Sequence, residues 1–425
     1  MSRDDARQTP RLGSDSAPMR PRRLVQFAVI AGAIFLVAGP VLYFEFPREV
    51  GRWYQAASDE QRLNGEYDAA IEHLTTAIDW DEQSAELLVR RAELKLQRGG
   101  WKSALEDCDR AAELSGGARL AVATRTECLH NLGRNSEAVQ QWRDLLTELS
   151  DELEDLDRAQ LLNGFAYACA VGNLDLDEAI VAVDEAIQLS VNEAALLDPE
   201  GVLYAGRAMV ENELGRLSEA LISYQRAGKS ASAALEREKM RFDALKTSGK
   251  AAEEYARRVA VLRPHLAGIL TMRAELLAKL KKPNEAKRDR ERLDSLSIDG
   301  NLSVALPLDL SQAMLVVANN AAILDTRGLL YYHLGDLEEA LQDTENAVVS
   351  ADWQMKAFEW FSGISRSFTV DLRLQEEQKR LRARSVAVIH YHRMLVLEKL
   401  GKTDRAAKDR ARIVQLGYDP SEELF

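Results

Sequence analysis

Small apolar residues recur along this chain with a fixed step, and the residues around them follow the period of an α-helix. Ala70, Ala104 and Ala138 are each 34 residues apart. A glycine stands five residues before each alanine, and another apolar residue stands seven residues after it. The arrangement recurs at Ala220, Ala340 and Ala406, and less regularly at Ala179 and Ala286. A step of this length, repeated along the chain, predicts a stack of helix pairs.

The glycine and the alanine have separate roles in each predicted pair. Glycine adopts the left-handed backbone conformation at low cost, so it ends the first helix. The alanine lies in the second helix and lets the two helices approach closely. A larger residue four positions on, such as Leu74, Trp142 or Tyr224, fills the space beyond. The alternating runs that are typical of β-strands are nearly absent, so we predict an all-α protein.

Three segments that carry this pattern resemble the tetratricopeptide repeat (TPR) family: LNGEYDAAIEHLTTAI (63–78), LGRLSEALISYQRA (214–227) and LGDLEEALQDTENA (334–347). The resemblance implies an α-solenoid of about eight to nine TPR-type helix-turn-helix repeats. On this register the repeats cover 51–84, 85–118, 119–152, 157–195, 201–234, 267–300, 321–354 and 387–420. A degenerate pair is expected at 235–266. The stretches 300–320 and 354–386 depart from the pattern, so we expect extra helices or loops there, with a bend or a division into two arrays.

The stretch from Leu24 to Phe44 contains no charged residue and is long enough to cross a bilayer as a helix. We predict a transmembrane helix at 24–45, and a cleaved signal peptide is the competing interpretation. Six arginines precede the segment, so the positive-inside rule places the N-terminus in the cytoplasm and the repeats on the extracytoplasmic side. The predicted domains are a disordered basic tail (1–23), this helix, a first TPR array (51–300) and a C-terminal TPR array (301–425) with an insert at 354–386.

Charge and composition narrow the class of partner. The formal net charge is −13, with charged residues at 29% and aromatic residues at 6%. An acidic solenoid repels nucleic acid, so we expect no nucleic-acid partner, and basic protein surfaces remain suitable partners. The three cysteines, Cys108, Cys128 and Cys169, each lie in a helical pattern and are interpreted as packing residues.

The TPR resemblance implies a concave groove lined by the first helix of each repeat. Carried onto this sequence, one groove position gives Asp59, Glu93, Glu127, Phe165 and Met209 in successive repeats. Tyr332 and Tyr391 are further candidates, because aromatic side chains suit protein recognition. Such a groove would be acidic at first and mostly apolar further on, and would suit a segment with basic residues at one end. Alternatively, the carboxylates only solvate an exposed helix face.

The chemistry-bearing residues do not form a recognisable active site. The six histidines are scattered, and no metal-binding, phosphate-binding or nucleophile motif is present. We therefore expect no catalysis, no metal, no cofactor and no small-molecule substrate.

Aromatic residues concentrate at 352–372, at the start of the insert, where Trp353, Trp360 and Phe361 form either a plug between two arrays or a docking patch for a partner or second subunit. The EEQKRLRARS segment that follows predicts a solvated, densely charged helix.

These patterns favour a membrane-tethered scaffold that binds partner proteins through the concave face of its solenoid. Two alternatives stay open. The chain could be a self-assembling structural membrane protein, or a regulatory accessory subunit of a membrane complex. A stoichiometric partner would support the scaffold, and self-association would support the structural role.

Overall fold

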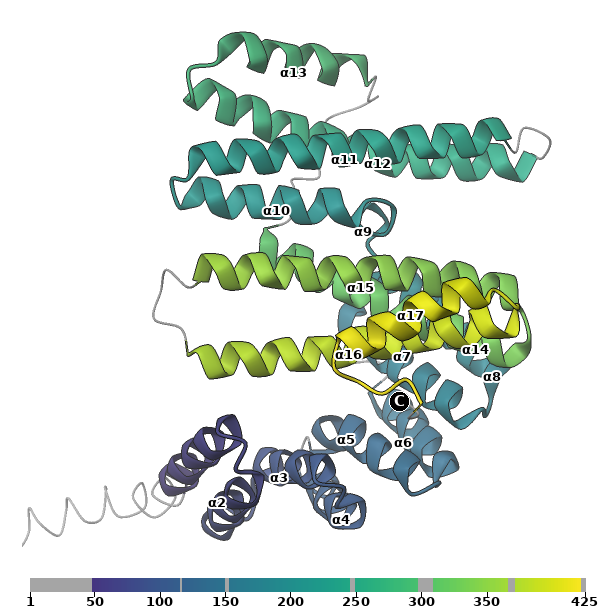
Figure 1. The fold of residues 1–425 in the computed structure, drawn as a ribbon. Coiled ribbons are helices and arrows are strands. Elements are labelled where there is room, and N and C mark those ends of the chain that lie inside the picture. Colours follow the sequence, from purple (N-terminus) through teal and green to yellow (C-terminus); the bar gives the residue numbers. More distant parts are fainter. Residues whose placement is uncertain are drawn as a thin grey trace, which may run out of the picture.

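The computed structural model describes residues 48–114, 117–149, 153–244, 249–296, 309–365 and 371–421, and every regular element in these ranges is an α-helix (Figure 1). Consecutive helices form antiparallel hairpins, and the hairpins stack side by side. The predicted all-α solenoid of helix-turn-helix repeats is therefore confirmed. The first helix of each hairpin is called helix A below, and the second is called helix B.

Eight hairpins follow the predicted register. The first four are residues 48–63 with α2 (Tyr67–Trp80), α3 (Ala85–Gln97) with α4 (Trp101–Ala112), α5 (Gly117–Asn131) with α6 (Asn135–Glu148), and α7 (Asp155–Gly172) with α8 (Leu176–Ser190). The short α9 (Glu193–Leu197) leads to α10 (Pro199–Glu213) with α11 (Leu217–Ala244), then α12 (Gly249–Lys279) with α13 (Pro283–Ser295). The last two are α14 (Leu310–Leu334) with α15 (Leu337–Ser365), and α16 (Leu372–Lys399) with α17 (Thr403–Gln415).

The residues that define the repeat lie where their spacing predicts. All eight alanines are buried, with exposed fractions from 0% to 3%. Six glycines end A helices with φ between +70° and +89°: Gly65, Gly99, Gly133, Gly215, Gly335 and Gly401. A Cβ atom at any of these six would meet nothing within 4 Å, so glycine is favoured there by backbone conformation and not by space.

Two repeats reach the same turn with other residues. Spacing paired Gly172 with Ala179, but Gly172 is the last residue of α7, and Asn173 after it has the left-handed φ of +51°. In the repeat that contains Ala286, Lys281 takes this place with a φ of +56°. Asparagine tolerates the left-handed region better than most residues with a side chain, whereas lysine is strained there.

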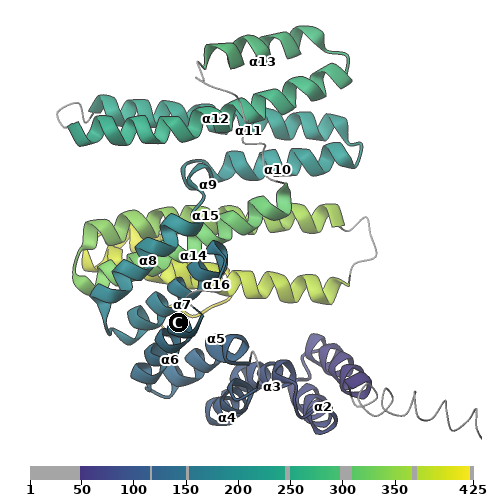
Figure 2. The ribbon, with the colours of Figure 1, turned by 180° about the vertical axis from the view of Figure 1, so that it is seen from behind.

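The hairpins do not stack in the order in which they follow along the chain. Helix α14 packs against α7 and α8, and its Ile323, Leu329 and Leu330 belong to the same apolar cluster as the cores of those helices. Asn320 of α14 accepts from the backbone N–H of Asn192 at 3.0 Å and donates to its carbonyl at 2.9 Å. Hairpin α14–α15 therefore continues the stack from α7–α8, and helices α9–α13 form a side branch (Figure 2).

The stretches that depart from the repeat pattern lengthen regular helices. In the region predicted as a degenerate pair, residues 235–244 are the end of α11 and residues 249–266 are the first turns of α12, with Pro264 inside α12, so its described residues form no separate repeat. Residues 310–320 are the first turns of α14, and 354–365 are the last turns of α15. Residues 372–386 are the N-terminal half of α16, and we call them the α16 arm.

The predicted single-pass membrane localisation is corrected here. The segment 24–45 on which it rested, and the tail 1–23, lie outside the described residues. In the part of the chain that the structure describes, none of the helices combines the length and the apolar character that crossing a bilayer requires. The longest of them, α12, has 31 residues but carries lysine, arginine and glutamate along its length, and such side chains are costly in hydrocarbon. The predicted orientation is withdrawn with the localisation.

Candidate functional site

The A helices of the first three repeats carry a row of carboxylates on the inner side of the solenoid. Neighbouring A helices such as α3 and α5 approach each other more closely than neighbouring B helices, so the A helices line the inside of the curve. Asp59 and Glu60 lie on the 48–63 helix, Glu93 on α3 and Glu127 on α5. We call these four residues the acidic face. The structure thus brings together the three acidic residues that the sequence placed in a groove.

The carboxylates of the acidic face differ in how closely arginine side chains approach them. Asp59 Oδ1 lies 3.5 Å from Arg62 Nη2 and 3.5 Å from Arg90 Nη1, which are both long contacts. Glu93 makes no hydrogen bond or ion pair to any residue in the described ranges. The side chain of Glu93 is exposed, but partial desolvation by the surrounding helices raises its pKa, although Arg90 and Arg62 act to lower it. A cation placed beside Glu93 would favour its charged form, because opposite charges stabilise one another at reduced dielectric.

The first half of α16 runs alongside the first three repeats (Figure 1, Figure 2), and the α16 arm supplies two cations to the acidic face. Arg373 donates from Nη1 to Glu60 Oε1 at 2.6 Å and to Asn64 Oδ1 at 2.8 Å. Further along the arm, Arg384 donates from Nη2 to Glu127 Oε1 at 2.8 Å. Between these contacts, Glu377 of the arm pairs with Arg62.

The sequence did not single out either arginine: Arg384 was part of the segment predicted to be a solvated, densely charged helix, and Arg373 lies just before that segment. A usable signal was nevertheless present. Arg373 and Arg384 are eleven residues apart, which is about three helical turns, so both side chains lie on one face. That this face meets the first three repeats depends on contacts between residues more than 250 apart in the chain.

The apolar groove candidates differ in burial and in location. Phe165 is 2% exposed and belongs to the core of α7 and α8, and Tyr391 is 8% exposed, so neither offers a surface to a partner. Met209 is half-buried on the side branch, away from the acidic face. Tyr332 is half-buried, with Lys399 Nζ 4.4 Å from its ring centroid.

The aromatic residues of the insert lie at the junction between the side branch and the main stack. Trp360 of α15 stacks on Tyr204 of α10, with ring centroids 4.7 Å apart, and Trp353 meets the same ring edge-on at 5.9 Å. Arg207 of α10 lies over the Trp360 ring, 5.2 Å from its centroid. Phe361 is also in α15, but its side chain is outside the described set. Trp353 and Trp360 therefore contact another part of the same chain, as a plug between two arrays would.

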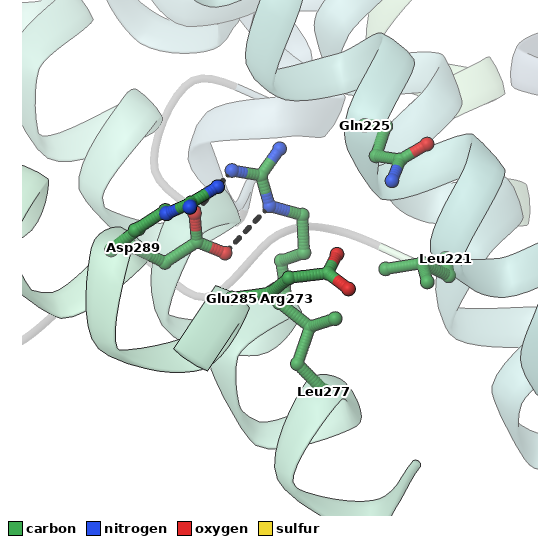
Figure 3. Close-up of a pocket in the computed structure, with 7 residues that line it drawn as sticks. Leu221, Gln225, Arg273, Leu277, Glu285 and Asp289 are labelled. Atoms are coloured by element: carbon green, nitrogen blue, oxygen red, sulfur yellow. Dashed lines mark hydrogen bonds and ion pairs between the residues drawn. The ribbon is translucent and has the colours of Figure 1, made fainter. Parts of the chain in front are cut away.

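A cavity of about 190 Å³ opens between α11, α12 and α13 (Figure 3). Arg273 points into it and donates from Nε to Asp289 Oδ2 at 2.7 Å, and its Nη2 donates to the other carboxylate oxygen. The walls also carry Glu285 and Arg288, so both signs of charge are present. Because the Arg273 guanidinium is already held by Asp289, we assign no ligand to this cavity.

The same arginine–aspartate pair recurs in other repeats. Arg91 with Asp107, Arg327 with Asp343 and Arg393 with Asp409 are each 16 residues apart and bidentate. The aspartates are buried, and the arginine of each pair comes from helix A and the aspartate from helix B. These pairs fasten the two helices of a hairpin together. Sequence reasoning missed them, although the recurring step of 16 residues is visible in the chain.

Two of the histidines that the sequence left unassigned form buried pairs with aspartates. His390 Nδ1 lies 2.6 Å from Asp409 Oδ1, and His392 Nδ1 lies 2.8 Å from Asp325 Oδ2. Among the described residues, no group of three or more histidine, cysteine or acidic side chains is arranged to hold a metal ion.

Comparison with known proteins gives neither a family model nor a curated protein that matches the chain. Similar solved structures include the crystal structure of MamA protein, which is 16% identical over 43% of this chain and 93% of that chain, with a TM-score of 0.28. A tetratricopeptide repeat protein from Parabacteroides merdae is 15% identical over 79% of this chain and 99% of that chain, with a TM-score of 0.29. Yeast Tom70 is 14% identical over 87% of this chain and 76% of that chain, with a TM-score of 0.25.

Proposed function

We propose that this TPR-type solenoid is a scaffold that binds a partner protein through the acidic face of its first three repeats, without chemistry of its own. The observation that carries the proposal is Glu93. It is an exposed carboxylate on α3, it makes no ion pair within the described ranges, and desolvation by the surrounding chain raises its pKa. A lysine or arginine from a partner would compensate it, and charge complementarity of this kind supplies specificity in protein interfaces.

Reversing the charge at Glu93 tests this proposal. We expect Glu93→Lys to reduce the recovery of a stoichiometric partner at least about tenfold, because a basic segment would meet a like charge. The full-length chain is cross-linked in cells and purified, and the co-purifying proteins are quantified by mass spectrometry. Glu106→Lys is the matched control, because Glu106 is exposed on helix B, which lines the outer side of the solenoid.

Two outcomes would contradict the proposal. Equal recovery of the same proteins with Glu93→Lys and Glu106→Lys would show that the acidic face does not bind them. Cross-links formed only between copies of the chain would favour the self-assembling structural role that the sequence left open.

A further inference from the structure

The α16 arm shows which kind of ligand the acidic face accepts. It is a helix that presents two arginines on one side, about 16 Å apart at 1.5 Å per residue. Arg373 pairs with Glu60 in the first repeat, and Arg384 pairs with Glu127 in the third. The acidic face of this chain is therefore already occupied by a basic helix of the chain itself.

Among the described residues, the arm meets the acidic face and its neighbours Arg62 and Asn64 through ion pairs and hydrogen bonds of polar side chains. The side chains of the Arg373–Glu60 pair are 44% and 53% exposed, and those of the Arg384–Glu127 pair are 48% and 35% exposed. Exposed ion pairs contribute little to stability, because water screens the charges and long side chains lose freedom. None of the apolar clusters formed by the described residues joins α16 to the first three repeats. A competing ligand could therefore displace the arm at low cost.

The other side of the arm is fixed more firmly. Ala383 and Val386 are buried in one cluster with Met355 of α15, and Arg382 lies over the Phe358 ring, 4.3 Å from its centroid. This anchoring keeps the arm close to the acidic face, so that it acts as a tethered ligand at high effective concentration. No ion pair joins a described residue of the arm to Glu93. A partner helix with a further basic residue between its two arginines would make one contact that the arm does not make.

We propose that the acidic face recognises a partner helix that carries two arginines eleven residues apart, and that the α16 arm is an intramolecular competitor for the same carboxylates. This inference rests on the proposed function and names the chemistry of the partner. Binding of the partner helix displaces Arg373 from Glu60 and Arg384 from Glu127. The carboxylates thereby give up their ion pairs with the arm and form ion pairs with the partner helix.

A peptide copy of the arm provides the probe. A fluorescent peptide of residues 371–386 is titrated with the full-length chain, and binding is measured by anisotropy. We expect the variant Arg373→Gln/Arg384→Gln, in which the arm has lost both arginine contacts and keeps the Glu377–Arg62 pair, to bind the peptide about tenfold more tightly than the wild type. Adding Glu60→Gln/Glu127→Gln to this variant removes the gain, because the carboxylates that receive the arginines are then absent.

The matched control removes two other positive charges from the same arm. Lys379→Gln/Arg380→Gln changes the net charge equally, but the side chains of Lys379 and Arg380 make no hydrogen bond or ion pair with the acidic face in the described structure. We expect its affinity for the peptide to equal that of the wild type. Circular dichroism verifies that all variants keep their helix content.

Three results would overturn the inference: equal affinity of the wild type and the arm-released variant, an equal gain in the control, or no peptide binding to any variant. The experiments distinguish failure of this inference from failure of the proposed function. If a partner is lost on Glu93→Lys but the arm has no effect on the peptide, only the inference is wrong. If the arm competes with the peptide but no partner depends on Glu93, only the proposed function is wrong.

Discussion

At the scale of single residues, buried charge pairs fasten neighbouring helices to one another. Asp107, Asp289, Asp343 and Asp409 are at most 5% exposed, and each accepts two hydrogen bonds from one guanidinium. A bidentate arginine matches a carboxylate in shape as well as in charge. Removing one partner would leave the other charge buried and uncompensated, which is more costly than the intact pair is stabilising. The recurrence of the pair in several repeats therefore reflects the geometry of the hairpin.

The last two repeats are joined by a titratable version of the same arrangement. His390 of α16 lies between Asp409 of α17 and Asp352 of α15, whose Oδ2 is 3.5 Å from His390 Nε2. Arg393 and Arg412 pair with these two aspartates. Burial alone would lower the pKa of His390, but the two carboxylates outweigh it and raise the pKa above the ordinary value of 6.5. The pKa values of Asp352 and Asp409 are lowered by His390 and the arginines, despite burial.

These shifts predict how stability depends on pH. The stabilisation from protonated His390 is fully present below about pH 6.5 and is lost as the pH rises through its raised pKa. The contribution of the two aspartates is present above about pH 3.8 and is lost in more acidic solution. We expect the thermal midpoint of the wild type to fall between pH 6 and pH 8.5, and His390→Gln to reduce this fall. An equal fall in both proteins, measured by circular dichroism, would exclude His390 as its cause.

At the scale of the helical hairpin, a small residue and a left-handed turn determine the geometry. Ala104 of α4 has no exposed surface and belongs to one apolar cluster with residues of α2, α3 and α5. Gly99, five residues earlier, ends the turn after α3 with a φ of +74°. The alanine sets how closely the helices approach, and the glycine sets the direction in which helix B departs.

Enlarging the small residue tests this account of the hairpin. We expect Ala104→Trp to lower the free energy of unfolding by about 1–3 kcal/mol, because the indole has no space between the packed helices. Glu106→Trp, at an exposed position of the same helix, should change it by less than about 0.5 kcal/mol. Urea unfolding followed by circular dichroism measures both. An unchanged midpoint in Ala104→Trp would contradict the assigned register.

At the scale of the whole molecule, the main stack and the side branch meet where α9 and α10 pack on α14 and α15, through an apolar cluster and an aromatic one. Hairpin α14–α15 follows α7–α8 in space although helices α9–α13 lie between them in the chain. The extended end of α15 reaches α10 through Trp353 and Trp360. The next helix, α16, begins with the α16 arm. These two consecutive helices therefore contact the side branch through α15 and the acidic face through α16.

Truncating Trp360 tests whether this junction is structural. We expect Trp360→Ala to destabilise the junction by about 2 kcal/mol, because the ring loses its contacts with Tyr204 and Arg207. Amide hydrogen exchange should become faster in α10 and in the last turns of α15, and stay unchanged in α3–α6, since stability in repeat proteins is local. Trp101→Ala, at a 40% exposed position of α4, is the control. Loss of a partner protein without faster exchange would instead support a docking patch.

The sequence by itself determined the class of the fold, the length of the repeat and the positions of the turns. These properties follow from local rules, because a glycine such as Gly335 ends a helix and an alanine such as Ala340 allows close packing wherever they occur. It also determined that Asp59, Glu93 and Glu127 share one side of the first repeats, because equivalent positions of stacked repeats lie in a row.

Only the tertiary structure decided the stacking order, the burial of Phe165 and Tyr391, and the meeting of the α16 arm with the acidic face. The 34-residue pattern describes how a hairpin is built, but it does not state which hairpin packs on which. That choice depends on side chains far apart in the chain, such as Ile323 against α7 and α8, and Arg384 against Glu127. Contacts of this kind have no fixed spacing, and a periodic signal therefore contains no information about them.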